Sequence, residues 1–248
     1  MKLALVYLGR RGAGGPISLA LGRALAEHVE LQAFVSTRQE TLPAWRSATF
    51  PYHAVETFSN PVGLAWSLLT RRGIRALAAR IQVFQPDVLL FPMIHPWNAA
   101  LQAALEPTPS VVMVHDPRPH PGLVGKIIRR FEDPSLWRAE RCMVFSHSLI
   151  ADLYGRGVQA GRISVAPLGL TAGVRDAYGN GVPSSPLAFT VVQGGGTAVA
   201  PPGVSDGNGN ATAIMTLSRY AGVATVQAVS SAAPQGAAFF TVTATPNG

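Results

Sequence analysis

The chain has 248 residues, of which 48% are hydrophobic and 13% are charged. This length suits one large domain or two modest ones, and no run approaches the ~20 apolar residues of a membrane-spanning helix. A single cysteine, Cys142, excludes an internal disulfide framework. The net charge of +7 comes entirely from residues 1–169, because the basic and acidic residues that follow cancel. Such an asymmetry predicts two domains, at residues 1–169 and 170–248.

Predicted strands and helices alternate along the first half. The continuous apolar run at residues 3–8 is typical of a strand buried on both faces, with a short secretory signal as the second interpretation. Further strands are expected at residues 29–36, 49–55, 88–91, 110–115, 141–145 and 163–166. Helices are expected at residues 16–28, 61–84, 97–105, 122–132 and 146–154. This alternation predicts an α/β domain with a Rossmann-like open parallel sheet.

The pattern changes after residue 169. Glycine and proline recur about every ten residues, and alternating apolar patterns run between them. Strands are expected at residues 187–192, 211–217, 223–229 and 237–244. Turn signals stand at Asn180-Gly181 and at residues 206–209, where Gly or Asn supplies a positive φ. Short strands at this spacing predict an all-β sandwich.

A glycine-rich loop, residues 9–15, joins the first strand to the first helix. Glycine lets a backbone approach a ligand closely, and free N–H groups at a helix start attract phosphate or carboxylate. The loop therefore has two interpretations, an anion or sugar-phosphate cradle and a tight turn. It is not a dinucleotide fingerprint, because Ile17 stands at the third glycine position and no acidic residue follows the second strand near Ser36.

The segment from His115 to Gly122 leaves the carboxyl end of a predicted strand, where open α/β sheets bind ligands. It places two His, one Asp and one Arg among three prolines. His115 could act as a general base or bond a hydroxyl. His115, Asp116 and His120 could also contact a metal, but no further ligands stand at metal-site spacing. The alternative is a polar loop with one structural histidine.

Several motifs occur in a fixed order along the first half. They are the glycine-rich loop, QPDVLLFP at 85–92, VVMVHDPRPHPG at 111–122, RAERCMVFSHSLIADL at 138–153 and GRISVAPLG at 161–169. With this order and spacing, residues 1–169 resemble the N-terminal, acceptor-binding domain of family-4-type GT-B glycosyltransferases. The expected fold is thus the GT-B N-terminal half.

The resemblance implies that the glycine-rich loop and the histidine loop face an interdomain cleft. It implies His115 as the catalytic candidate and the following ligand-binding candidates: Gly12, Gly14, Gly15, Asp116, His120 and Ser146. Ser146 equally suits a helix N-cap. No metal or resident cofactor is expected. The family's nucleotide-sugar donor is held by a second Rossmann-like domain with a paired-Glu motif, and no Glu follows Glu140. We therefore expect an incomplete transferase that is inactive alone.

The second half resembles a different family. The segments at 173–196, 205–229 and 239–245 are similar to group 1 bacterial Ig-like domains of the invasin and intimin type. Asp176 and Asp206 are expected to brace turns by accepting local N–H bonds. The first strand of that family is not recognisable before Leu168. The join therefore suggests a fused, truncated or artificially combined chain.

Partners and location follow from both resemblances. A glycan or a lipid-linked acceptor is implied. The basic helix at 122–132, with Lys126, Arg129 and Arg130, suits peripheral contact with anionic lipid or an ordinary solvated face, and the cluster at residues 71–75 is interpreted in the same way. No nucleic-acid motif accompanies the charge. A cytoplasmic, membrane-associated location is expected, with the cell surface as the alternative. Two other functions stay open, a non-enzymatic adhesion protein and a carbohydrate- or phosphate-binding domain.

Overall fold

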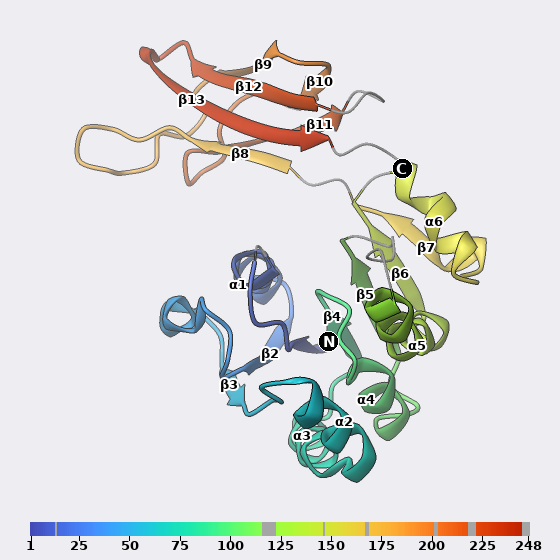
Figure 1. Cartoon of the computed structure of the whole chain (residues 1–248). Helices are drawn as coiled ribbons and strands as arrows, with labels where there is room; N and C mark the ends of the chain where they lie inside the picture. Colours follow the sequence, from blue (N-terminus) through green and yellow to red (C-terminus); the bar gives the residue numbers. More distant parts are fainter. Residues whose placement is uncertain are drawn as a thin grey trace. The chain divides into compact units, whose positions relative to one another are not determined.

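The structure of the protein is a computed structural model (Figure 1). It describes residues 1–12, 14–115, 123–145, 147–166, 169–200, 203–217 and 222–244. The chain divides into two compact units, Met1–Ala166 and Pro167–Gly248. The division falls close to the junction that the change of sequence pattern predicts.

The first unit is built on a sheet of seven parallel strands (Figure 1). The strands are β1 (Lys2–Tyr7), β2 (Glu30–Ser36), β3 (Tyr52–Val55), β4 (Val88–Phe91), β5 (Ser110–Val114), β6 (Arg141–Val144) and β7 (Ile163–Val165). Their order in the sheet is β3-β2-β1-β4-β5-β6-β7. The predicted parallel α/β sheet is confirmed.

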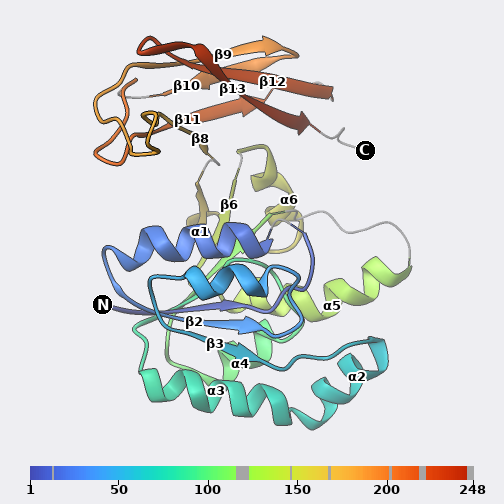
Figure 2. The same cartoon turned by 90° about the vertical axis from the view of Figure 1, so that its left-hand side faces the viewer.

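Helices cover both faces of this sheet, with α1 on one side and α2 and α3 on the other (Figure 2). The helices are α1 (Gly14–Ala26), α2 (Pro61–Thr70), α3 (Arg72–Phe84), α4 (Asn98–Ala104), α5 (Leu123–Arg138) and α6 (Ile150–Gly155), with short 3-10 turns η1 (Leu42–Ser47), η2 (His147–Leu149) and η3 (Ala160–Arg162). No helix in the described ranges is long and apolar enough to cross a membrane.

The strand period of two divides the core into two layers. In β1, Ala4 and Val6 join the cluster under α3 and α4, whereas Leu3 and Leu5 join the cluster under α1. Because side chains on both faces of β1 are buried, its sequence is one continuous apolar run.

The prediction of one long helix at 61–84 is wrong in one respect, because the chain forms two helices that are separated at Arg71. Arg71 has a left-handed φ of 54° and closes α2, while its backbone N–H donates to the Ser67 carbonyl at 2.9 Å. The break lets the second segment turn its apolar side inward. In α3, Ile74, Leu77 and Ile81 are buried, whereas α2 has no fully buried residue.

Two other predicted helices have different bounds. The helix expected at 122–132 continues to Arg138 with Pro134 inside it. The helix expected at 146–154 divides into η2 and the short α6. Single-sequence patterns mark the existence of such elements better than their ends.

The second unit contains two antiparallel sheets of three strands, β10-β11-β8 and β13-β12-β9. The strands are β8 (Gly169–Gly173), β9 (Leu187–Gln193), β10 (Gly196–Val199), β11 (Asn210–Leu217), β12 (Gly222–Ser230) and β13 (Ala233–Ala244). The sequence pattern did not predict β8 and β10. Both sheets contribute to one apolar cluster, which contains Ala172, Val174, Leu187, Ala211 and Ala228.

Two aspartates close turns in this unit, as the sequence predicts. Asp176 Oδ1 accepts the N–H groups of Tyr178 and Asn180 at 2.9 Å. Asp206 Oδ1 accepts those of Asn208 and Asn210 at 2.9 and 2.8 Å. The side-chain amide of Asn180 contributes most to lowering the pKa of Asp176, with backbone bonds adding to it.

Candidate functional site

The candidate site lies at the carboxyl edge of the sheet in the first unit. The strand order β1-β4-β5 places the ends of three strands side by side. Neighbouring strands are about 4.8 Å apart, so the loops after β1 and β5 are separated by about one strand. Ligands of open α/β sheets bind at this edge. The glycine-rich loop and His115 are therefore brought to one edge, as the sequence predicts.

The glycine-rich loop owes two of its glycines to close packing. Gly14 and Gly15 open α1 and are buried. A Cβ on Gly14 would lie 2.5 Å from Met93 Cε, and one on Gly15 would collide with Thr41 Oγ1. Close packing alone thus accounts for both glycines, and their role in ligand binding stays a prediction.

Gly12 is the exposed glycine of this loop, and its φ of 85° favours glycine. Its N–H is already engaged, because it donates to Glu40 Oε1 at 2.8 Å. The Glu40 backbone N–H also donates to the Arg10 carbonyl at 3.0 Å, which ties the loop to the segment after β2. An exposed carboxylate therefore stands where a phosphate cradle would need free N–H groups.

Tyr7 lies under this loop at the end of β1. Its hydroxyl approaches Gly9 and Gly14 so closely that a Cβ on either glycine would meet the ring. Burial raises the pKa of the Tyr7 phenol, and the negative charge of Glu40 raises it further. The Tyr7 phenol is thus neutral beneath the loop.

A second cluster follows β4, and no sequence motif predicted it. His95 is buried, its ring stacks on Phe58 with centroids 5.4 Å apart, and its Nδ1 accepts the Trp97 N–H at 3.2 Å. The Arg10 guanidinium lies over Phe58 at 5.6 Å and donates to the Ser59 carbonyl at 2.7 Å. This cluster joins the loops after β1 and β4 to the segment before α2.

The protonation state of His95 is set by its surroundings. Burial and, to a smaller extent, the positive charge of Arg10 together lower the pKa of His95 from 6.5 to about 3. A neutral imidazole thus holds these loops together. The rule that selected His115, a histidine just beyond a strand end, also applies to His95 and would have found it.

His115 stands at the end of β5 and is exposed. Its ring makes an edge contact with the half-buried Phe145, with centroids 5.7 Å apart and planes at 65°. The other three predicted residues, Asp116, His120 and Ser146, lie outside the described residues. Where the chain is described, no group of three or more His, Cys, Asp or Glu could hold a metal ion.

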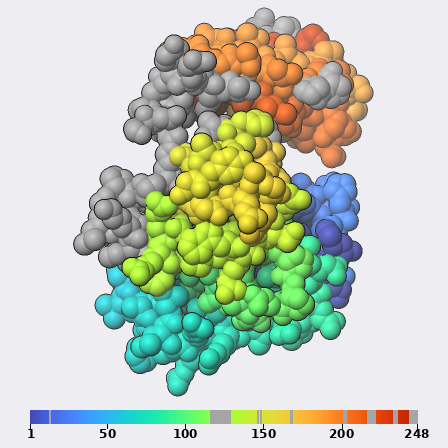
Figure 3. All heavy atoms as spheres, turned by 90° about the vertical axis from the view of Figure 1, so that its right-hand side faces the viewer, coloured from blue at the N-terminus to red at the C-terminus, as the bar shows by residue number. Residues whose placement is uncertain are grey.

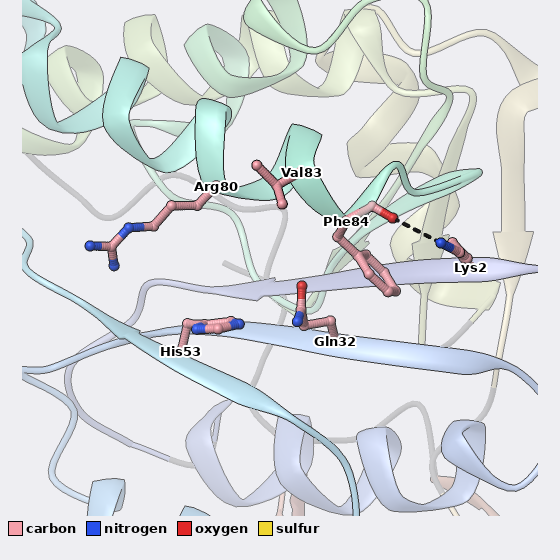
Figure 4. A pocket seen from close by; sticks show the side chains of 6 residues that line it. All are labelled: Lys2, Gln32, His53, Arg80, Val83 and Phe84. Atoms are coloured by element: carbon pink, nitrogen blue, oxygen red, sulfur yellow. Dashed lines mark hydrogen bonds between the residues drawn. The ribbon is translucent and has the colours of Figure 1, made fainter.

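A groove of about 420 Å³ lies elsewhere, between α3 and the strands β1, β2 and β3 (Figure 4). It is lined by Lys2, Gln32, His53, Arg80, Val83 and Phe84. In Figure 4, Arg80, Val83 and Phe84 extend from α3 above the strands that bear Gln32 and His53. Of the predicted site residues that the structure describes, Gly12, Gly14, Gly15 and His115, none lines this groove.

Sequence comparison decides the family. The glycosyl transferase 4-like domain matches residues 12–169, well over half of the chain. The chain belongs to the glycosyl transferase 4-like family. This assignment confirms the predicted resemblance of the first half. No curated protein sequence matches the chain.

Solved structures share the fold of this glycosyl transferase 4-like domain. HepE of Anabaena in complex with UDP aligns with a TM-score of 0.51 and 11% identity, over 68% of this chain and 44% of HepE. A putative UDP-N-acetylglucosamine 2-epimerase of Listeria monocytogenes has a TM-score of 0.52, 13% identity, and coverage of 66% and 44%. The Neisseria meningitidis 2-epimerase bound to UDP-GlcNAc has a TM-score of 0.50, 13% identity, and coverage of 66% and 46%. The match thus spans less than half the length of these proteins.

Proposed function

We propose that residues 1–169 form the acceptor-binding half of a nucleotide-sugar-dependent hexosyl transferase, with His115 as the residue that contacts the acceptor. Family membership supports the transferase class. The choice of the acceptor side rests on the carboxylate of Glu40 at the Gly12 N–H.

A carboxylate and a phosphate repel each other, whereas a carboxylate accepts hydrogen bonds from sugar hydroxyls. An anion bound at this loop would have to displace Glu40 from Gly12. A neutral glycan could instead bond the free carboxylate lone pairs, because Glu40 is exposed and accepts one N–H there. The loop thus suits a hydroxyl-bearing acceptor better than the diphosphate of a donor.

His115 fits the role of a contact to the reacting hydroxyl. An exposed imidazole can accept a hydroxyl proton when it lies within hydrogen-bond reach. The Phe145 ring beside it adds an apolar surface, and small-molecule sites commonly combine the two. Asp116 and His120 follow in the same loop and are proposed as further contacts.

We also propose that residues 170–248 form an Ig-like module and that these 248 residues alone do not transfer sugar. Two antiparallel sheets that share one apolar cluster support the first point. The lack of any Glu after Glu140 supports the second, because the family's paired-Glu motif has no counterpart there. A nucleotide-sugar donor would then require a second Rossmann-like lobe.

Calorimetry with hexose-terminated glycans tests the role of His115. We expect His115→Ala to weaken binding of a recognised glycan by about 5- to 10-fold, the value of one lost hydrogen bond. His28→Ala, at an exposed histidine outside the site, is the matched control and should leave affinity unchanged. Unaltered glycan binding by His115→Ala would remove His115 from the site, and sugar transfer by the chain alone would refute the proposed incompleteness.

Glu40→Gln separates the acceptor from the phosphate interpretation. The amide oxygen can still accept the Gly12 N–H, while the negative charge is lost. We expect glycan affinity to fall by roughly 3- to 10-fold, because hydrogen bonds to a charged acceptor are the stronger kind. Tighter binding of UDP or inorganic phosphate by Glu40→Gln, with unchanged glycan affinity, would instead favour the phosphate cradle.

A further inference from the structure

Polar side chains stand near the beginning of three neighbouring strands, on the face of the sheet that α3 covers. Side chains alternate between the two faces of a strand, so Lys2 and Ala4 share a face, and the register places Gln32 beside Ala4. His53 pairs in register with Phe34 on the same face. Ala4 and Phe34 belong to the core cluster under α3 and α4. Apolar side chains would extend this core outward, and the three polar ones end it instead.

The groove between α3 and these strands has the size of a ligand site (Figure 4). Its volume of about 420 Å³ falls within the range of small-molecule sites, about 300–1,000 Å³. It lies toward the amino ends of the strands, since Lys2 opens β1, whereas His115 stands at the carboxyl end of β5. None of its lining residues that the structure describes belongs to α4, α5 or α6, which are green to yellow in Figure 3. The groove is therefore separate from the proposed acceptor site.

The two cations of the groove differ in what surrounds them. In Figure 4 Arg80 and His53 lie at one end of the groove and Lys2 lies at the other. Lys2 is already engaged, because its Nζ lies 3.9 Å from Glu30 Oε1 and donates to the Phe84 carbonyl at 3.4 Å. Arg80 is exposed and makes no ion pair within the described part of the chain. Among the described lining residues, Arg80 thus carries the uncompensated charge.

The other lining residues supply hydrogen-bonding groups and an apolar wall. His53 is held by stacking on Phe34, with ring centroids 5.3 Å apart, and its N–H group can donate to an anion. Gln32 lies between the two ends of the groove and offers both a donor and an acceptor. Val83 and Phe84 extend from α3 above the strands. The groove thus combines a cationic end with an apolar wall.

We propose that this groove binds a small soluble organic anion. The phosphate or carboxylate group of this ligand bonds Arg80 and His53. Its apolar body lies against Val83 and Phe84. A guanidinium forms two parallel hydrogen bonds to either kind of anion, and an aromatic body suits the Phe84 ring because offset ring pairs gain energy beyond burial. The inference stands apart from the proposed acceptor function and does not require it.

An inorganic anion and a lipid surface fit this groove less well. Inorganic phosphate would bond the cationic end and leave the apolar wall without a contact. A bilayer surface would meet the exposed Arg80 and Val83 but not Gln32, which is half-buried on the strands beneath α3. A small molecule with one anionic end reaches all of these groups.

Titration of the full chain with phenyl phosphate, followed by two-dimensional NMR, tests the proposal. We expect saturable shifts of the Gln32 side-chain amide and of backbone amides in β1, β2, β3 and α3, with a Kd on the order of 1 mM. Inorganic phosphate and phenol each carry one half of this probe. Each should bind at least about fivefold more weakly than phenyl phosphate.

Three variants assign the binding to the groove. Arg80→Gln should weaken phenyl phosphate binding by about tenfold, because a charge-assisted hydrogen bond is lost. The matched control is Arg75→Gln, which removes the same charge from an exposed position of the same helix outside the groove and should stay within about twofold of the parent. Val83→Ser should weaken binding by about threefold and leave the thermal transition unchanged, since Val83 is 86% exposed.

Several outcomes would overturn the proposal. They are the absence of saturable shifts, equal affinity for phenyl phosphate and inorganic phosphate, and equal losses in Arg80→Gln and Arg75→Gln. Sedimentation with phosphatidylglycerol vesicles distinguishes a lipid surface from a soluble ligand. Vesicle binding that Arg80→Gln abolishes, in a chain whose groove amides do not respond to phenyl phosphate, would also contradict the assignment.

Discussion

Arg156→Met is expected to lower the free energy of unfolding of the first unit by about 3 kcal/mol. The Arg156 side chain is 3% exposed, and its Nη2 lies 2.6 Å from Asp133 Oδ1 and 3.4 Å from Glu132 Oε2. Its backbone carbonyl accepts the Trp137 indole N–H at 2.8 Å. Removing the guanidinium leaves two adjacent, partly buried carboxylates without this positive charge. Chemical denaturation followed by circular dichroism measures the loss.

The matched control is Arg38→Met, which breaks the exposed pair with Glu56. Both of those side chains are well exposed to solvent. Exposed pairs contribute about 0–1 kcal/mol, so this variant should stay close to the parent. Comparable losses in the two variants would show that burial does not strengthen the Arg156 cluster.

His95 should make the first unit sensitive to acid. Its folded pKa of about 3 lies below the ordinary value of 6.5, so as pH falls the unfolded chain takes up the proton first. The contribution of neutral His95 to the free energy of unfolding is fully present above about pH 6.5. It is lost progressively as the pH falls to about 3. When the pH falls from about 8 to about 5, the titration of His95 alone should lower the free energy of unfolding by about 2 kcal/mol. Denaturation curves at several pH values measure the slope.

His95→Asn isolates the contribution of this residue. The Asn Oδ1 can replace Nδ1 as the acceptor of the Trp97 N–H, while the titrating ring is lost. Stability at neutral pH should fall because the stack on Phe58 is removed. The pH dependence should flatten by about 2 kcal/mol over the same range, whereas His28→Asn should keep the parent slope. A parent-like slope in His95→Asn would contradict this assignment.

Much of the first unit could be predicted from local patterns. The apolar run at β1 and the alternation of strands and helices led directly to the parallel sheet. The break at Arg71 could not be predicted, because apolar spacing continues through it and no glycine or proline marks the left-handed residue. In the second unit β8 and β10 were missed, because the strands are short and carry glycine.

The site was predictable only in part. His115 and the glycine-rich loop follow strand ends, and the strand-end rule places them at one edge whatever the details of packing. Glu40 was missed because it is distant from Gly12 in the chain and meets it only where β1 and β2 pair. Gly14 and Gly15 are closely packed, a requirement that the sequence does not distinguish from ligand binding, and their role in binding stays a prediction.

The sequence by itself determined the α/β alternation, the change to antiparallel strands after residue 169 and the family of the first half. Each of these can be recognised from local periodicity or from the order of motifs. The tertiary structure decided that Glu40 occupies the loop, that His95 is neutral and that Arg156 is paired. These properties depend on burial and on charges brought together from distant segments. Neither quantity is encoded in the spacing of neighbouring residues.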